Sequence, residues 1–225
     1  LRNLNLGIVG NGEVAALVDT DATVVWACRP RLDGDPVFCA LLDSDREPDA
    51  TGLFAIEVVD AAQTSQRYLR NTAILETVID DAHGNRLHIR DFCPRFRARG
   101  RIFRPAMLVR LIEPLAGRPM VRLRVRPRFE HGECAPQVVR GSHHIAYRGR
   151  SHGFRITTNG SLSAIADESA CIVDAPLALV LGPDQTVEES PTALAGDFLA
   201  RTQAYWDDWV RGLAIPFDWQ DAVIR

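Results

Sequence analysis

The segment Val121-Arg122-Leu123-Arg124-Val125-Arg126 alternates apolar and arginine side chains at every position. A strict period of two places the apolar residues on one face of a β-strand and the arginines on the other. Such a strand has one buried and one solvated face, as antiparallel sheets commonly do. We interpret the arginine face as solvated, with anion binding by guanidinium groups as the alternative.

Strands of this kind continue on both sides of the segment, from Leu4 to about Pro183. Alternating runs occur at 53–58, 86–92 and 154–158, and nearly continuous apolar runs occur at 13–18, 23–27, 107–112 and 176–181. Continuous apolar runs are expected where a strand is covered on both faces. Turn residues separate the runs, at 19–21, 83–85, 116–119 and 150–153. Many short strands with regular turns predict a mainly β fold, a sandwich or a barrel.

Two helices are predicted outside this pattern. A short helix over 37–42 has Asp35 as its N-cap and Pro36 at its first position. It runs into the acidic stretch 43–49, which has D-x-D spacing but lacks the glycine and terminal glutamate of a calcium loop, so a solvated connection is expected there. A long helix runs from Pro191 to about Leu213, with Ser190 as its N-cap.

The long helix carries two adjacent apolar stripes. One consists of Leu194, Phe198, Thr202, Tyr205 and Trp209, and the other of Leu199, Trp206, Val210 and Leu213. Together they are wider than a one-sided surface helix needs, so the helix is expected to lie between two bodies. Phe198, Tyr205, Trp206 and Trp209 are the candidate interdomain residues. A further capped helix start at 216–225 has no stop signal, which indicates the start of a truncated helical domain.

Composition excludes several classes of protein. The net charge is −3 and the pI about 6.1, so neither nucleic acid nor an anionic membrane surface is an expected partner. No apolar run approaches the ~20 residues that span a bilayer. All 26 basic residues are arginine, which we attribute to codon bias. Five scattered cysteines without a C-x-x-C pair indicate reduced thiols in a cytoplasm.

Catalytic and cofactor motifs are sparse. The order of glycines in Gly7-Ile8-Val9-Gly10-Asn11-Gly12 is wrong for a dinucleotide fingerprint, no G-x-S-x-G occurs, and His143 and His144 point to opposite faces of a strand. No cofactor and no metal are therefore expected. Asp33 and Asp35 are the best local pair of acids for glycoside cleavage.

The loop that holds these acids is the best local candidate for a site. Trp26, Arg29, Arg31 and Asp33 are assigned to substrate binding or to a domain interface, because loops that carry such groups often meet a ligand. The alternative is that Arg31 and Asp33 pair with each other or with a neighbouring domain.

The stretches 7–12, 15–19, 25–26 and 30–38 resemble, in this order, the opening of bacterial glucoamylase/trehalase-type proteins, glycoside hydrolase family fifteen. Similar matches follow at 68–77, 91–95, 108–110 and 126–129. Tyr205-Trp206 and 219–223 resemble the linker helix and the first barrel helix of that family. Leu32 and Gly34 stand where the family commonly shows Phe and Ser.

This resemblance implies a large antiparallel β-sandwich over 1–185, a linker helix over 186–215, and over 216–225 the first helix of a missing (α/α)6 catalytic barrel. The two catalytic glutamates of the family lie in that barrel, so no residue here inherits a catalytic role. The implied function is the non-catalytic domain of an inverting, exo-acting α-glucosidase, expected to be inactive alone. Its partners would be its own catalytic domain and, through it, an α-glucoside. A self-standing carbohydrate-binding or oligomerisation module is the alternative, and a homo-oligomer stays open.

Overall fold

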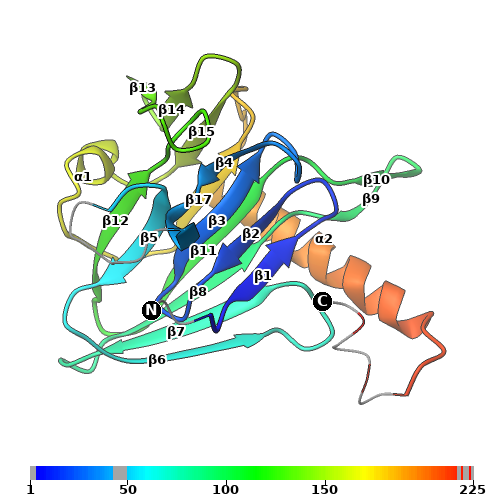
Figure 1. The fold of residues 1–225 in the computed structure, drawn as a ribbon. Coiled ribbons are helices and arrows are strands. Elements are labelled where there is room, and N and C mark those ends of the chain that lie inside the picture. The colour runs from blue at the N-terminus through cyan, green and yellow to red at the C-terminus, as the bar shows by residue number, and fades with distance from the viewer. Residues whose placement is uncertain (1–3, 43–49, 217–218, 220–222, 224–225) are drawn as a thin grey trace.

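A computed structural model of the chain describes residues 4–42, 50–216, 219 and 223 (Figure 1). Its described part consists mainly of antiparallel strands in two large sheets, with one long helix near the C-terminus. This arrangement agrees with the predicted β-sandwich.

The first sheet, sheet A, contains seven strands in the order β1-β2-β3-β5-β12-β16, with β4 paired to β3. Their bounds are Gly7–Gly10 (β1), Ala15–Val18 (β2), Thr23–Arg29 (β3), Asp35–Phe38 (β4), Leu53–Val58 (β5), Met120–Arg126 (β12) and Cys171–Ile172 (β16).

The second sheet, sheet B, contains eight strands in the order β13-β14-β15-β17-β11-β8-β7-β6. Their bounds are Ala61–Tyr68 (β6), Leu75–Asp81 (β7), Arg86–Phe92 (β8), Leu108–Ala116 (β11), Gln137–Arg140 (β13), His144–Arg148 (β14), Gly153–Thr158 (β15) and Leu177–Gly182 (β17).

Three shorter or separate elements complete the fold. A two-stranded hairpin of Phe96–Ala98 (β9) and Arg101–Phe103 (β10) extends from the body and is hydrogen-bonded to neither large sheet (Figure 1). Helix α1 spans Leu162–Ala166 and helix α2 spans Pro191–Arg211. None of the helices in the described residues is long and apolar enough to cross a membrane.

The main core lies between the two sheets. Phe38 and Phe54 of sheet A and Phe154 of sheet B are fully buried there, with ring centroids 6.0 Å apart in the Phe38–Phe54 and Phe38–Phe154 pairs. Aromatic contacts of this kind add to the stabilisation from burial.

Arg110 of β11 crosses this core as a polar tie between the sheets. Its guanidinium group donates to both carboxylate oxygens of Asp91, at 2.8 and 3.1 Å, and both side chains have no exposed surface. It also donates to the backbone carbonyls of Ala22 and Phe54 in the opposite half of the sandwich. A buried charge is tolerated only when it is paired and hydrogen-bonded in this way.

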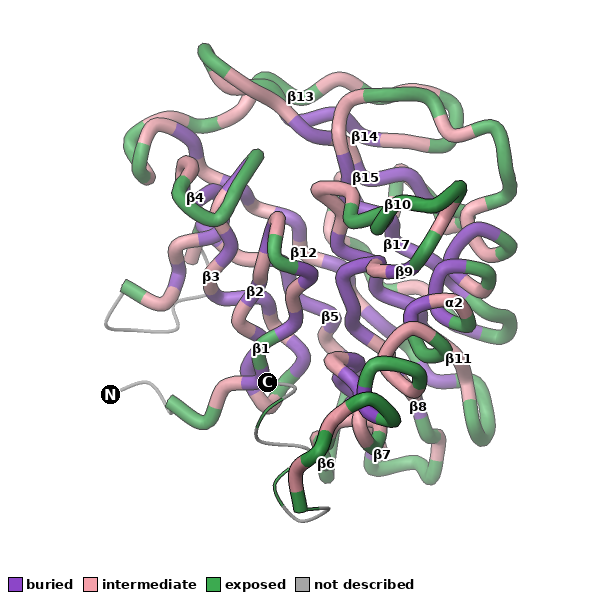
Figure 2. Tube along the Cα trace, turned by 90° about the vertical axis from the view of Figure 1, so that its right-hand side faces the viewer, coloured by how far each residue is buried: buried purple, intermediate pink, exposed green. Residues whose placement is uncertain are grey.

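Two central strands of sheet B are buried on both faces, as their nearly continuous apolar runs predict. In β17, Leu177, Leu179 and Leu181 join the core between the sheets, whereas Ala178 and Val180 join a second core under α2. In β11, Val109 and Leu111 also belong to the second core. Helix α2 thus covers the outer face of sheet B, and Figure 2 shows its buried side turned toward the strands.

The opening segment, now β12, alternates as predicted. Val121, Leu123 and Val125 are buried. Its arginines form a ladder of ion pairs, in which Arg124 contacts Glu57 at 3.1 Å and Arg126 contacts Glu168 at 2.6 Å. The arginine face therefore pairs with carboxylates from β5 and from the segment after α1.

The prediction of a short helix over 37–42 is wrong. Asp35–Phe38 forms strand β4, and only a single 3-10 turn at Ala40–Leu42 follows. The capping signal was real but acts elsewhere, because the Asp35 carboxylate accepts hydrogen bonds from the backbone N–H groups of Glu130 and His131, at 2.7 and 2.8 Å. The acidic stretch 43–49 lies outside the described residues.

Helix α2 agrees with the predicted long helix to within two residues at its end. Leu194, Phe198, Leu199, Thr202 and Val210 from the two predicted stripes are buried. Ser190 occupies the N-cap position without a capping hydrogen bond from its side chain. Most of the predicted helix over 216–225 lies outside the described residues, and the predicted domain boundaries remain predictions.

Candidate functional site at the end of helix α2

A cavity of about 410 Å³ lies between the β1–β2 hairpin and the C-terminal half of α2. We call it the Trp206 groove. Five segments that are distant in the sequence meet in it, and its lining residues are Ile8, Gly10, Asn11, Gly12, Val14, Ala15, Leu32, Tyr68, Ala73, Arg95 and Trp206. The fold thereby brings together most of the stretches that carry the family resemblance.

Asn11 holds the hairpin turn at the floor of the groove. Its side-chain oxygen accepts from the backbone N–H groups of Glu13 and Val14, and its side-chain nitrogen donates to the carbonyls of Pro94 and Pro105. With all four bonds made and only 2% of the residue exposed, Asn11 is a structural anchor. The glycines whose order does not fit a nucleotide-binding motif thus belong to a tight turn.

The backbone of the turn at Gly12 lies close to the side chain of Arg95. Its φ is +82°, and a Cβ there would lie 3.2 Å from a guanidinium nitrogen of Arg95. Only glycine meets both conditions without strain.

Arg95 connects the turn to α2. Its guanidinium group donates to the Asn11 carbonyl and to the Tyr205 hydroxyl, at 3.0 Å for the latter, and stacks over the Tyr205 ring at 5.2 Å. Its backbone N–H donates to the Thr202 hydroxyl at 3.2 Å. Because these contacts use the guanidinium group internally, Arg95 positions the helix against the sandwich.

The remaining surface of the groove is largely apolar. The Tyr68 hydroxyl both donates to and accepts from the backbone of Ile8, so its polar group is satisfied within the chain. Ile8 and Leu32 are 42% and 51% exposed beside the half-buried Trp206. Exposed apolar residues gathered beside an aromatic side chain are typical of a protein-binding surface.

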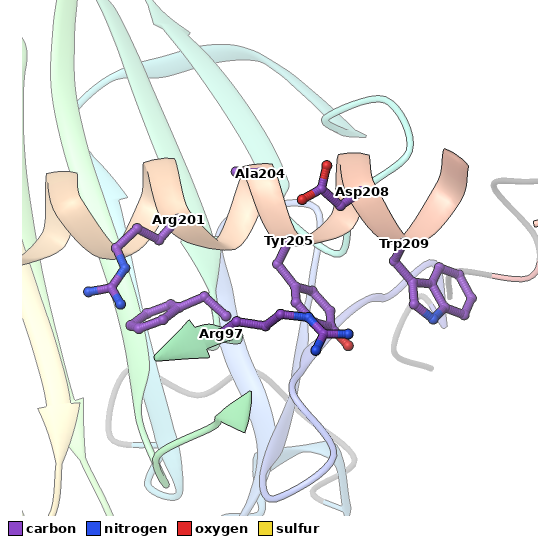
Figure 3. Close-up of a pocket in the computed structure, with 7 residues that line it drawn as sticks. Arg97, Arg201, Ala204, Tyr205, Asp208 and Trp209 are labelled. Carbon is purple, nitrogen blue, oxygen red and sulfur yellow. The ribbon is translucent and has the colours of Figure 1, made fainter. Parts of the chain in front are cut away.

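A second cavity, of about 300 Å³, lies along α2 beside the β9–β10 hairpin (Figure 3). It is lined by Phe96, Arg97, Arg201, Ala204, Tyr205, Asp208 and Trp209. Arg201 stacks on the Phe96 ring at 3.8 Å, and Trp209 is 37% exposed. Trp206 and Trp209 meet edge to face at 5.7 Å and so join this cavity to the groove.

The four predicted interdomain residues of α2 fall in two environments. Phe198 is buried against Phe96 and Phe103, with centroids 5.4 and 5.7 Å away. Tyr205, Trp206 and Trp209 line the two cavities. One side of the helix is thus buried by sheet B, while its C-terminal aromatic residues stay partly open in this chain.

The residues predicted around the loop after β3 have separate environments. Arg31 and Asp33 bond each other, at 3.0 and 2.8 Å, with both side chains mostly exposed. Trp26 pairs with Leu17 across β2 and β3, on the outer face of sheet A. Asp35 binds the turn at Glu130, as described above, so Asp33 and Asp35 have separate structural roles.

Arg29 points into the sandwich. It is 4% exposed, and its Nε is buried without a hydrogen-bond partner among the described residues. Burial lowers the pKa of the guanidinium group to about 10, and burial raises the pKa of the nearby Cys93 thiol to about 12. The described residues contain no cluster of three or more His, Cys, Asp or Glu side chains that suits a metal ion.

Asn11, Tyr68 and Arg95 are site residues that the sequence reasoning missed. Each lies in a stretch that resembles the family, and this was the only signal available. Their roles depend on contacts across 60 to 110 positions of the chain, such as Tyr68 to Ile8 and Arg95 to Tyr205, which local periodicity does not reveal.

Comparison with known proteins gives one family and two named relatives. Residues 4–180 match the model of the family described as trehalase-like, N-terminal. A trehalase of Thermoplasma volcanium is 26% identical over 164 residues, which are 72% of this chain and 24% of that protein. Trehalase 1 of Sulfolobus acidocaldarius is 40% identical over 80 residues, which are 35% of this chain and 13% of that protein. The matches thus span a quarter or less of either relative, and both relatives are archaeal.

Proposed function

The chain belongs to the trehalase-like N-terminal family, and from this we propose that it is the non-catalytic N-terminal domain of an inverting, exo-acting glycoside hydrolase that cleaves α-glucosidic bonds. Its role is to support a catalytic (α/α)6 barrel encoded in the same polypeptide. Trehalose is the first substrate to test, because both named relatives are trehalases.

The observation that carries this proposal is the Trp206 groove together with the cavity along α2. Both are hollows with exposed apolar or aromatic residues, and the polar residues that line the groove, Asn11, Tyr68 and Arg95, are hydrogen-bonded inside the chain. The groove therefore suits the side chains of another protein body better than a polyhydroxylated ligand, which needs free donors and acceptors.

The scarcity of carboxylates among the residues that line this surface also favours a supporting role. An inverting glycosidase needs two carboxyl groups about 6.5 to 9.5 Å apart. The residues lining the groove include no Asp or Glu, and those lining the cavity along α2 include only Asp208.

The proposal is tested by assaying hydrolysis of trehalose and maltose with residues 1–225 and with the full gene product. We expect hydrolysis from the full product only. Turnover by the 225-residue chain at a comparable rate would sink the proposal, and so would an inactive full product that is correctly folded.

A matched pair of variants tests the supporting role. Trp206→Ala in the full product removes the groove's aromatic side chain, and we expect lower activity and a lower unfolding temperature. Leu115→Ala alters an apolar residue that is 55% exposed near the end of β11 and should change neither. Equal effects of the two changes would contradict the supporting role of the groove.

A self-standing carbohydrate-binding module is the second candidate, and the half-buried Trp206 that lines a groove is the observation in its favour. Isothermal titration of residues 1–225 with trehalose and with maltooligosaccharides separates the two functions. Saturable heat that Trp206→Ala abolishes would support the module. The absence of heat at millimolar sugar would remove it.

A further inference from the structure

The hairpin β9–β10 and its flanks form a basic projection, which we call the arginine arm (residues 95–104). It holds five of the 26 arginines and none of the 29 acidic residues. A two-stranded hairpin is marginally stable alone, and this one pairs with neither large sheet. Repulsion among the arginines of such a hairpin is unfavourable, and carboxylates on a partner would relieve it.

The base of the arm is fixed to the body. Phe96 and Phe103 stack on each other at 4.8 Å, and both contact Phe198 of α2. Arg95 is bonded as described above, and Arg104 lies 3.9 Å from the Glu13 carboxylate. The arm therefore extends in a defined direction from the body (Figure 1).

The tip of the arm differs from its base. Arg97, Arg99 and Arg101 are exposed, and among the described residues none of them makes an ion pair or a side-chain hydrogen bond. Ile102, which is 44% exposed, lies directly across the hairpin from Arg97. Arginine is enriched in protein-binding hot spots, so exposed arginines without a partner in the described part of the chain, beside an exposed apolar residue, favour a protein-binding surface.

A hollow lies at the foot of this tip. A cavity of about 900 Å³ is bounded by the arm together with Phe198 and Arg201 of α2. It shares Phe96, Arg97 and Arg201 with the cavity along α2. The arm and the aromatic end of α2 are thus parts of one continuous surface.

We propose that the arginine arm docks onto an acidic face of the polypeptide that follows α2, with Arg97, Arg99 and Arg101 pairing with carboxylates and Ile102 filling an apolar spot between them. This inference rests on the proposed function, because it takes the catalytic domain as the partner. Continuity with α2 supports that choice, since the chain leaves the sandwich along this helix.

Charge favours a protein partner over nucleic acid. The chain as a whole carries −3, and Asp208, whose carboxylate accepts a hydrogen bond from Arg211, is among the residues that line the cavity next to the arm. A phosphate backbone laid along this surface would meet that carboxylate as well as the arginines, whereas a folded acidic face can present its carboxylates to the arm alone.

The test uses three charge-neutral substitutions at the tip, Arg97→Gln, Arg99→Gln and Arg101→Gln, combined in the full gene product. The control combines Arg118→Gln, Arg140→Gln and Arg150→Gln, three exposed arginines outside the arm, of which Arg118 and Arg140 pair with Asp174 and Asp167 within the chain. Unfolding temperature is measured at low and at high salt for both variants and the wild type, and repeated on residues 1–225.

We expect the tip variant of the full product to unfold about 5 °C lower at low salt, and this difference to shrink at high salt, because salt screens the pairs. In residues 1–225 the same variant should have the same unfolding temperature as the wild type, since the arm has no partner to dock on there. Equal unfolding of variant and wild-type full products would overturn the proposal, as would an equal loss in residues 1–225.

Two further measurements separate the alternatives. A mass in solution that shows a dimer of residues 1–225, lost in the tip variant, would make a second copy the partner. If the wild type binds a single-stranded 20-mer oligonucleotide at physiological salt and the tip variant does not, nucleic acid is the partner. Either of these two results overturns the proposal. Trehalose hydrolysis by the wild-type full product is measured in parallel, so that failure of the proposed function is seen independently of arm docking.

Discussion

Arg110 and Arg29 are both buried in the sandwich, yet their energetic situations are opposite. Arg110 has a carboxylate and two backbone carbonyls as acceptors. Arg29 has an Nε without a partner among the described residues, and burial lowers its pKa to about 10. The same type of side chain therefore stabilises the fold at position 110 and destabilises it at position 29.

Replacing Arg110 by Met should destabilise the domain by about 3 to 5 kcal/mol, because it leaves the Asp91 carboxylate buried without a counter-charge. Urea denaturation of residues 1–225 measures this loss. Arg118→Met is the control, since Arg118 pairs with Asp174 on the surface and such pairs contribute about 0 to 1 kcal/mol. A loss at Arg110 no larger than that of the control would contradict the assigned role.

Replacing Arg29 by Met should raise stability at pH 7 by about 1 to 3 kcal/mol, because an unpaired buried charge disappears. The pKa of Arg29 is lowered from 12.5 to about 10 in the folded state. Above pH 10 the folded state releases the proton first, so the wild type recovers stability as pH rises, by linkage.

The gap between the variant and the wild type should therefore narrow above pH 10. Groups present in both proteins cancel in this difference. Urea denaturation of both at pH 7 and at pH 10.5 gives the comparison, and a gap that widens with pH would show that the charge is compensated in the folded chain.

At the scale of elements, α2 illustrates how position within one helix decides the effect of a substitution. Phe198 is buried in the second core, whereas a Cβ placed on Gly196 would meet nothing within 4 Å. The two residues are separated by one position and lie on different sides of the helix.

Gly196→Ala should raise stability by about 1 kcal/mol, through the helix propensity of alanine alone. Phe198→Ala should lower it by about 3 to 5 kcal/mol, through loss of burial and a residual cavity. Thermal or urea unfolding of the two variants of residues 1–225 checks both signs. Destabilisation by Gly196→Ala would show that this side of the helix is occupied.

At the scale of the whole molecule, sheet B needs a cover on each face. Sheet A covers one face, and α2 covers Val109, Leu111, Ala178 and Val180 on the other. The helix is thus part of the fold of the sandwich as well as the path toward any following domain.

A chain that ends at residue 189 should consequently lose solubility or bind a hydrophobic dye, because it exposes this apolar face. A chain that ends at residue 213 retains α2 and should remain monodisperse without dye binding. Size-exclusion chromatography and dye fluorescence of the two chains test this. Identical behaviour of both would mean that α2 is dispensable for the sandwich.

The sequence predicted correctly those features that depend on interactions between residues close together in the chain. The alternation in β12, the two-sided strands β11 and β17 and the limits of α2 were predicted, because local periodicity reports which faces of an element are buried. Strand β4 was mistaken for a helix because Asp35 and Pro36 form a genuine capping signal, which a hydrogen bond to the distant Glu130 overrides.

The sequence by itself determined a mainly β chain with one long helix and, through its resemblances, the family. Tertiary structure alone decided that Asn11, Tyr68 and Arg95 build one groove with Trp206, that Arg29 lies inside the sandwich, and that the arm stands apart from both sheets. The physical reason is that periodicity depends on neighbours within a few residues. These contacts instead join positions dozens of residues apart, and only the packing of two sheets and a helix brings them together.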